Sequence, residues 1–197
     1  QCRGSRKRSR TSLPTGAVAD FAEIDVQLTK DEEVVVIHDF SLKRLAHDSR
    51  KVKDLTLEEI KELEVGSWFS QEFYGEKIPT LEELIDVSGN DIRLNIELKP
   101  SGNADVLAKN VVEILNEKSY NDHVVISSLN LDALKMVTSY NPDLQVGYII
   151  PLALGMFEPD EFIDFYSLEM SFISKNLVNR LNAQGKEVHV WTVNNEE

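Results

Sequence analysis

The second half of the sequence repeats strand-like and helix-like segments, and this repetition constrains the fold more than any other feature. Short alternating or β-branched stretches predict strands, and longer segments with apolar residues every three or four positions predict helices. Such units predict a parallel sheet, in either a doubly wound α/β fold or a β/α barrel. No glycine-rich phosphate loop follows any strand, which argues against a dinucleotide-binding doubly wound fold. The predicted strands are 93–98, 124–128, 145–150, 164–169 and 187–193, and the predicted helices are 104–117, 131–140 and 175–184.

Composition indicates one globular domain with a substantial core, because the 197 residues are 42% hydrophobic and 28% charged. No apolar run approaches the ~20 residues of a membrane-spanning helix, so we expect no membrane span in this chain. The first ten residues are basic and no apolar segment follows them, so they do not read as a signal peptide.

Charge is distributed unevenly along the chain. Five of the 21 Lys and Arg residues lie in the first ten positions, which leaves 16 cations against 34 acids in the remainder. We expect residues 1–18 to be a disordered basic tail, and we expect the acidic body not to bind nucleic acid. The single Cys2 excludes an internal disulfide.

Residues 21–39 carry the most distinctive polar side chains of the first half. Polar and apolar residues alternate at first, so that Glu23, Asp25 and Gln27 share one face of a half-buried strand. The run 34–37 predicts a second strand, and the few residues between the two favour a β-hairpin. Two acids at positions i and i+2 present oxygen atoms to one side, which suits a hard divalent cation. An ordinary solvated strand face that carries acids by chance is the alternative interpretation.

The register of the hairpin decides whether a histidine joins the two acids. With Asp31 and Glu32 as the loop residues, Asp25 lies opposite His38, and opposed residues share a face with Cβ atoms roughly 5 Å apart. An imidazole at that place can transfer protons near neutral pH. Glu32 is a poor residue for so tight a turn, so a slip by one residue is the alternative, and it would turn His38 to the far face.

The segment that follows the hairpin contains two similar helix starts. Thr56 and Thr80 each stand three residues before a Glu, which is the capping-box pattern, and they predict helices at 57–63 and 81–87. Between these helices, the loop 66–75 begins and ends with Gly and holds four aromatic residues. Such a loop either packs on the body of the protein or forms a lid or wall of a ligand cleft.

In a β/α barrel the carboxyl ends of the strands carry the chemistry, and polar residues stand at these positions here. Glu97 is the strongest candidate, because Asn95, Glu97 and Lys99 alternate with apolar residues and face one way at a strand end. A surface ion pair is the alternative interpretation of Lys99. The other polar residues at predicted strand ends are Ser127, Ser128, Glu169, Trp191 and Thr192.

Seven short motifs follow one another in a fixed order from about Ala19 to the C-terminus. They are Glu23-Ile-Asp25-Val-Gln-Leu-Thr-Lys-Asp, Val35-Val-Ile-His38-Asp39, Leu55-Thr-Leu-Glu-Glu, Gly66-Ser-Trp-Phe-Ser, Ile78-Pro-Thr-Leu-Glu-Glu, Asn95-Ile-Glu97-Leu-Lys99-Pro and Val190-Trp191-Thr-Val-Asn. In order and spacing they resemble the glycerophosphodiester phosphodiesterases, which are metal-dependent β/α barrels. The version seen here is most similar to bacterial members that carry an additional multi-pass membrane domain.

The resemblance implies a fold and a metal site. The fold would be α/β, a TIM (β/α)8-type barrel of the phospholipase-C-like phosphodiesterase kind over residues 19–197, with a small inserted subdomain at about 40–90. The cofactor would be a divalent metal, Ca²⁺ or Mg²⁺, which oxygen ligands suit. The residues that match the family's metal ligands are Glu23, Asp25 and Glu97.

The resemblance also implies an activity, namely metal-dependent hydrolysis of small glycerophosphodiesters to sn-glycerol 3-phosphate and an alcohol. His38 matches one of two catalytic histidines, of which one accepts the proton of the attacking glycerol hydroxyl and the other protonates the leaving alkoxide. Lys99 would assist in neutralising charge, and Trp191 matches an aromatic residue that lines the glycerol pocket.

The chain departs from the family pattern at both ends. Family members begin with a strand that ends in His-Arg-Gly and supplies the other histidine, whereas the similar tripeptide here is Cys2-Arg3-Gly4. The expected closing strand is not found before Glu197, so the resemblance predicts an incomplete barrel without its first and last strands. The alternative function is a catalytically impaired remnant, or a metal- or phosphodiester-binding module that lacks the first catalytic histidine. A third interpretation is a related barrel phosphodiesterase that acts on phosphoinositides or sphingolipids.

Overall fold

The computed structural model describes residues 20–89, 92–151 and 158–194, so the expected tail at 1–18 and Cys2 lie outside the described residues. The predicted elements of the second half are confirmed, with ends that shift by two residues at most. The strands are β1 (Phe21–Leu28), β2 (Val34–Val36), β3 (Arg93–Leu98), β4 (Val124–Ser128), β5 (Val146–Ile150), β6 (Phe165–Glu169) and β7 (Glu187–Trp191). The α-helices are α1 (Lys43–Ala46), α2 (Leu57–Glu62), α3 (Leu81–Ser88), α4 (Ala104–Glu117), α5 (Leu131–Tyr140) and α6 (Lys175–Ala183), and the 3-10 helices are η1 (Val52–Asp54), η2 (Gln71–Phe73), η3 (Asn121–His123) and η4 (Met170–Phe172).

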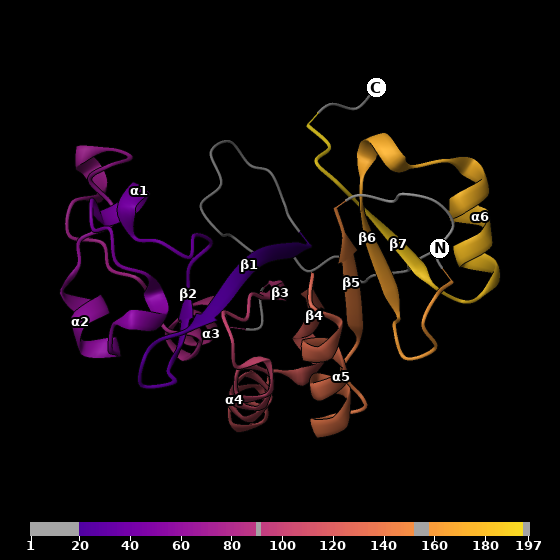
Figure 1. Ribbon diagram of the computed structural model, residues 1–197, viewed down its shortest axis with the longest axis horizontal. Helices are drawn as coiled ribbons and strands as arrows, with labels where there is room; N and C mark the ends of the chain where they lie inside the picture. The colour runs from indigo at the N-terminus through magenta and orange to yellow at the C-terminus, as the bar shows by residue number, and fades with distance from the viewer. Residues whose placement is uncertain (1–19, 90–91, 152–157, 195–197) are drawn as a thin grey trace.

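The strands form one sheet in the order β2-β1-β3-β4-β5-β6-β7, which Figure 1 shows from left to right. From β1 to β7 each strand is parallel to its neighbour, and β2 alone in the described sheet is antiparallel. Helices α4 and α5 lie together below the strands, and α6 lies beside β7 at the right (Figure 1). A doubly wound sheet reverses its strand order, and this order does not reverse. The fold is therefore the TIM-barrel-like α/β fold. Within the described residues the sheet runs from β2 to β7, and these two edge strands do not pair with each other.

Strand β3 illustrates how the sequence separates a core face from a functional face. Leu94, Ile96 and Leu98 are at most 1% exposed and belong to the main core, whereas Asn95 and Glu97 are half-buried on the opposite face. Each fully buried Leu or Ile contributes about 1.5–3 kcal/mol by leaving water. Apolar residues of the neighbouring elements complete this core, among them Val26, Leu107, Val111, Ile126 and Leu134.

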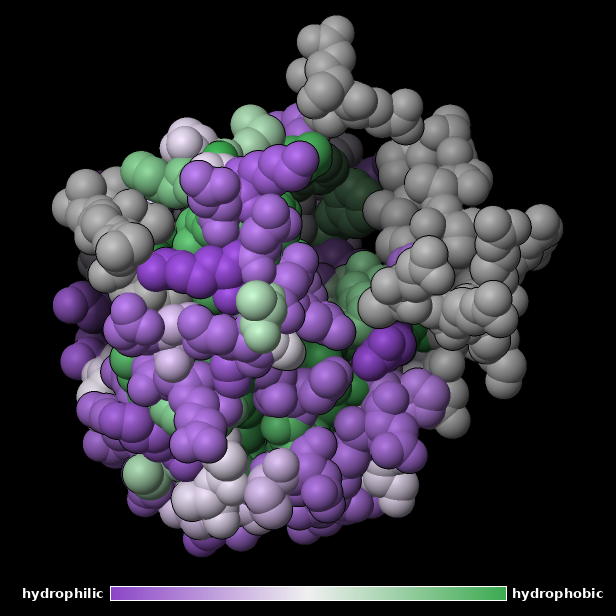
Figure 2. Space-filling model, turned by 90° about the vertical axis from the view of Figure 1, so that its right-hand side faces the viewer, coloured by the Kyte–Doolittle hydropathy of each residue, from purple (hydrophilic) through white to green (hydrophobic). Residues whose placement is uncertain are grey.

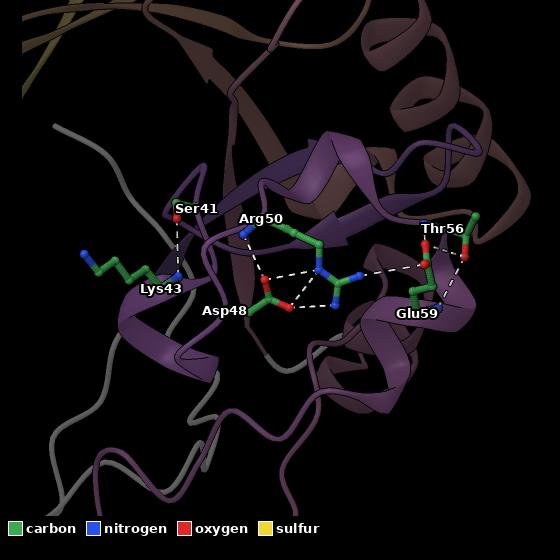
Figure 3. Close-up of polar contacts among 6 residues, drawn as sticks. All are labelled: Ser41, Lys43, Asp48, Arg50, Thr56 and Glu59. Atoms are coloured by element: carbon green, nitrogen blue, oxygen red, sulfur yellow. Dashed lines mark hydrogen bonds and ion pairs between the residues drawn. The ribbon is translucent and has the colours of Figure 1, made fainter.

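The segment between β2 and α3 has a small hydrophobic cluster of its own. It consists of Val35, Ile37, Leu42, Val52, Leu55, Ile60 and Ile78. Figure 3 shows polar contacts among six residues of the same segment. Arg50 lies 2.6 Å from Asp48 by its Nη2 atom and 3.8 Å from Glu59 by its Nη1 atom, so it connects the loop before η1 to the first turn of α2.

Both predicted capping boxes are confirmed. Thr56 accepts a hydrogen bond from the backbone N–H of Glu59 while the Glu59 side chain accepts one from the Thr56 backbone, and Thr80 and Glu83 repeat this arrangement at α3. Each box satisfies two N–H groups that a helix start leaves without partners, which stabilises these short helices.

The predicted register of the hairpin is wrong by one residue. The observed partners are Val26 with Val36 and Leu28 with Val34, which places Asp25 opposite position 37 rather than 38. The turn contains three residues instead of two, and Glu32 adopts the left-handed conformation with φ of 65°. A type I turn followed by a left-handed residue is the usual geometry of three-residue hairpin loops.

No helix in the described ranges is long and apolar enough to cross a membrane. Seen from the side on which α6 lies, hydrophilic residues cover most of the described surface, and hydrophobic residues show in smaller areas between them (Figure 2). Helix α6 matches this view, because it buries Leu181 and presents mostly polar residues to the outside.

Candidate active site

The three acids that the sequence singled out converge on one point. Asp25 on β1 and Glu97 on β3 are direct partners in the parallel pairing, and Glu23 lies two residues before Asp25 on the same face. One carboxylate oxygen from each of the three residues lies within 4.8 Å of the others. The in-register pairing of two adjacent parallel strands therefore produces the cluster.

These carboxylates suit a hard divalent cation. Burial, followed by the negative charges of Asp25 and Glu97, raises the pKa of Glu23 to about 7. Burial and the charge of Asp25 also raise the pKa of Glu97. The buried Oδ1 atom of Asp25 accepts no hydrogen bond of good geometry, although Lys99 lies near it. Three mutually repelling oxygen donors, one of them without a hydrogen-bond partner, are the ligand type that Ca²⁺ and Mg²⁺ take.

His38 lines the same cavity as the three acids, which has a volume of about 620 Å³. It does so although the register is shifted, because β2 ends at Val36 and His38 follows the end of the strand. Its side chain is 67% exposed, so a ligand in the cavity can reach the ring. The expectation that a one-residue slip would turn His38 away from the acids is therefore wrong.

The orientation of the His38 ring is set by Asp39 and Arg44. The His38 Nδ1 atom lies 2.7 Å from Asp39 Oδ1, and Arg44 Nε donates to Asp39 Oδ2 at 2.6 Å. The hydrogen bond from Arg44, followed by the one with His38, lowers the pKa of Asp39 to about 2. The Arg44 guanidinium in turn lies 5.0 Å from the centre of the Trp68 ring. Because the ionised Asp39 carboxylate accepts the hydrogen bond of the His38 Nδ1 atom, the Nε2 atom of the ring is left for proton exchange.

Lys99 and Trp191 line the cavity as well. Lys99 follows the end of β3, and its Nζ atom lies 3.3 Å from Asp25 Oδ1, with both side chains 11% exposed. Trp191 ends β7, and its indole Nε1 atom is buried without a hydrogen-bond partner. The structure thus brings all six predicted site residues into one cavity.

Other polar residues at the predicted strand ends separate into two groups. Asn95 and Ser127 line the cavity and have buried side-chain oxygen atoms without partners. Ser128 instead donates to the Leu98 carbonyl at 2.6 Å, and Glu169 caps η4, so both have structural contacts outside the cavity lining. The aromatic loop 66–75 does not contribute to that lining within the described residues, and the ring of Phe69 lies against those of Trp68 and Phe73.

Sequence reasoning assigned no role to Asp39 or Arg44. The adjacency of His38 and Asp39 is a signal that could have identified the first, because a carboxylate beside an imidazole commonly fixes its tautomer. No sequence signal identifies Arg44, which comes from a separate short helix, α1.

The raised pKa of Glu23, caused first by burial and then by the charges of Asp25 and Glu97, predicts how the metal-free protein responds to pH. Glu23 has a higher pKa in the folded protein than its ordinary value of 4.5, so between about pH 4.5 and 7 the folded state binds more protons than the unfolded state. The contribution of Glu23 to the free energy of unfolding should therefore decrease as pH rises through this window. Urea unfolding in a chelator at pH 5 and pH 8, on the wild type and Glu23→Gln, measures this contribution. Equal pH dependence of the two proteins would contradict the expectation.

The chain is similar to known proteins in both sequence and structure. The model of the Glycerophosphoryl diester phosphodiesterase family matches residues 14–197. A Glycerophosphodiester phosphodiesterase of Caldanaerobacter subterraneus is 37% identical, over 91% of this chain and 76% of the relative, and one of Bacillus subtilis is 30% identical, over 90% and 68%. The structure of an Oleispira antarctica phosphodiesterase in complex with the product sn-glycerol-3-phosphate has a TM-score of 0.81 and 30% identity, and the match covers 90% of this chain and 74% of that one.

The fold and the cavity define an enzyme of the β/α-barrel class whose cavity contains a cluster of three carboxylates. The chain belongs to the glycerophosphoryl diester phosphodiesterase family. This family consists of phosphoric diester hydrolases that generally depend on a divalent metal ion, and the acidic cluster fits such an ion.

Proposed function

We propose that this chain hydrolyses glycerophosphodiesters to sn-glycerol 3-phosphate and an alcohol with the help of Ca²⁺ or Mg²⁺. The observation that carries the proposal is a cluster of three carboxylates within 4.8 Å of one another, beside His38 in one cavity. Membership of the family and the product bound to the Oleispira antarctica relative support it. A module that binds without catalysis is not favoured, because relatives matched along nine-tenths of the chain are named as enzymes.

Glu23, Asp25 and Glu97 would hold the metal ion. When bound, the ion would polarise the phosphodiester and offset the negative charge that develops on its oxygen atoms. Carboxylate ligands favour hard cations such as Ca²⁺ and Mg²⁺ over softer metals, which prefer sulfur or nitrogen.

The remaining residues would bind substrate and move a proton. The Lys99 ammonium, which lies 3.3 Å from Asp25, would attract the phosphate oxygens into an otherwise acidic cavity. His38 would exchange a proton through Nε2 with either the attacking hydroxyl or the leaving alkoxide. Its Nδ1 atom would keep its own proton, which it donates to the Asp39 carboxylate. The free N–H of Trp191 would donate to a substrate oxygen, with the indole ring as a wall of the glycerol pocket.

We further propose that about 40–90 form a subdomain inserted in a barrel domain over 19–197. The separate hydrophobic cluster that extends to Ile78 supports this division, although Leu81 and Ile85 of α3 pack in the main core. Through the contact of Arg44 with Asp39, this segment also reaches the catalytic histidine.

An assay of glycerophosphocholine hydrolysis tests the proposed function. The purified protein should release sn-glycerol 3-phosphate in the presence of Ca²⁺ or Mg²⁺, a chelator should stop the release, and added metal should restore it. The measured quantity is sn-glycerol 3-phosphate in an enzyme-coupled assay. Absence of product with both metals and several head groups would contradict the activity, and release that continues in the chelator would contradict the metal site.

A further inference from the structure

Gln27 is a buried polar residue that the proposed mechanism does not use. It follows Glu23 and Asp25 on the same alternating face of β1, but its side chain is only 1% exposed and it does not line the cavity. Its Nε2 atom donates to the carbonyl oxygens of three consecutive residues, Ile37 at 2.8 Å, His38 at 3.1 Å and Asp39 at 3.1 Å. The backbone that carries the catalytic histidine is thus curved around one amide group.

The chemistry of the contact fixes the orientation of the amide. All three partners are carbonyl oxygens, which only accept hydrogen bonds, so the NH₂ group must face them and the amide oxygen must face away. Two N–H bonds serve three acceptors, so one hydrogen is shared between two carbonyls. A side chain without N–H groups leaves buried acceptors unsatisfied, and the curved segment then loses its central support.

Gln27 contacts the chain at the point where it leaves the sheet. The regular pairing of β2 with β1 ends near Ile37, whose N–H donates to the Asp25 carbonyl at 2.9 Å. Beyond that point the chain leaves the sheet, and Gln27 provides the contacts to the next two carbonyls. Asp39 orients the ring of His38, whereas Gln27 determines where its backbone lies. Asp39 therefore acts on the side-chain rotation of His38, and Gln27 acts on its backbone position.

We propose that Gln27 is a positioning residue that holds the His38 backbone so that the imidazole reaches the substrate. This proposal rests on the proposed function, because it takes His38 as the group that exchanges a proton. A displacement of a catalytic group by about 1 Å costs on the order of 10²-fold in rate. Because Gln27 does not line the cavity, we expect the binding of metal and substrate to be unaffected.

The test is a double-mutant cycle of Gln27 and His38. Gln27→Met has nearly the same shape without the N–H donors, and it should lower kcat about 10²-fold with KM changed less than about twofold. His38→Ala should lower kcat about 10³-fold. The double variant should have the same kcat as His38→Ala alone, because without the imidazole there is no catalytic group for Gln27 to position. Losses that multiply to about 10⁵-fold, or normal kcat in Gln27→Met, would overturn the proposal.

Thr29→Val is the matched control. Thr29 lies on the same face of the same chain segment and is 3% exposed, but its hydroxyl contacts Asp31 and the Glu33 backbone in the turn. This variant should lower the melting temperature as Gln27→Met does, and it should keep wild-type kcat. If Gln27→Met fails to fold, Gln27→Asn replaces it, because it keeps the amide but retracts it by one methylene, and it should show the same loss of kcat.

The NMR signal of the His38 ring, assigned by its absence in His38→Ala, provides a readout without turnover. The signal should shift or broaden in Gln27→Met and remain unchanged in Thr29→Val, and an unchanged signal in Gln27→Met would overturn the positioning role. A wild-type protein that releases no product, with this spectral response intact, would instead contradict only the proposed function and leave the contact of Gln27 with the His38 backbone supported.

Discussion

Replacing Glu97 by Gln is expected to abolish metal-dependent hydrolysis. Glu97 pairs directly with Asp25 and shares the 4.8 Å cluster with Glu23, so the amide removes one of three anionic ligands. Changing a residue that merely supports a metal ligand costs 10–100-fold, so loss of a ligand should lower kcat/KM by more than about 10²-fold. The measurements are turnover of glycerophosphocholine and metal affinity by titration calorimetry.

Glu113→Gln is the control for this experiment. Glu113 lies on the exposed side of α4 next to Lys109, and its replacement removes the same charge far from the cavity. Its activity and metal affinity should equal those of the wild type. Retained turnover in Glu97→Gln, together with unchanged metal affinity, would refute the role of Glu97 as a ligand.

The metal-free Glu97→Gln protein should also be at least as stable as the metal-free wild type. Burial and the charge of Asp25 raise the pKa of Glu97, which means that the ionised carboxylate is disfavoured in the folded state. In the wild type, excess Ca²⁺ or Mg²⁺ should raise the melting temperature by binding the folded state alone. In Glu97→Gln, added metal should no longer raise the melting temperature. Thermal unfolding of both proteins, with and without metal, measures the stability of the metal-free variant and the loss of this rise.

The second large effect is expected for His38→Ala. Loss of one proton-transfer group typically costs 10²–10⁴-fold, so kcat should fall by that order while metal affinity remains unchanged. Unchanged affinity distinguishes this variant from Glu97→Gln, because His38 lines the cavity but is not part of the carboxylate cluster. The measurements are kcat and KM with glycerophosphocholine, and metal titration.

His123→Ala is the matched control for His38→Ala. His123 precedes β4, at the amino end of the sheet, where its ring lies 5.5 Å from that of Tyr120. The control should keep wild-type kcat. If His38→Ala also keeps it, proton transfer by His38 is refuted, whatever the state of the metal site.

The elements that were predicted well are those determined by local interactions. A capping box lies within four residues, so Thr56 and Thr80 marked the starts of α2 and α3 without knowledge of the fold. Alternation along β3 likewise placed Asn95 and Glu97 on one face and Ile96 on the other. The turn was harder, because Glu32 adopts a left-handed conformation that its residue type does not favour, and the register was misplaced by one residue.

The sequence by itself determined that the second half forms a parallel sheet, which faces of its strands are apolar, and which side chains stand at the strand ends. The order of the strands, which distinguishes a barrel from a doubly wound sheet, came from the tertiary structure. Only the tertiary structure decided that Asp25 and Glu97 are direct partners, that His38 returns to the cavity after leaving the sheet, and that Gln27 supports it. The physical reason is that strand patterns record local burial, whereas Gln27 bonds to backbone carbonyls. Every residue carries the same carbonyl group, so no pattern of side chains identifies which three an amide will meet.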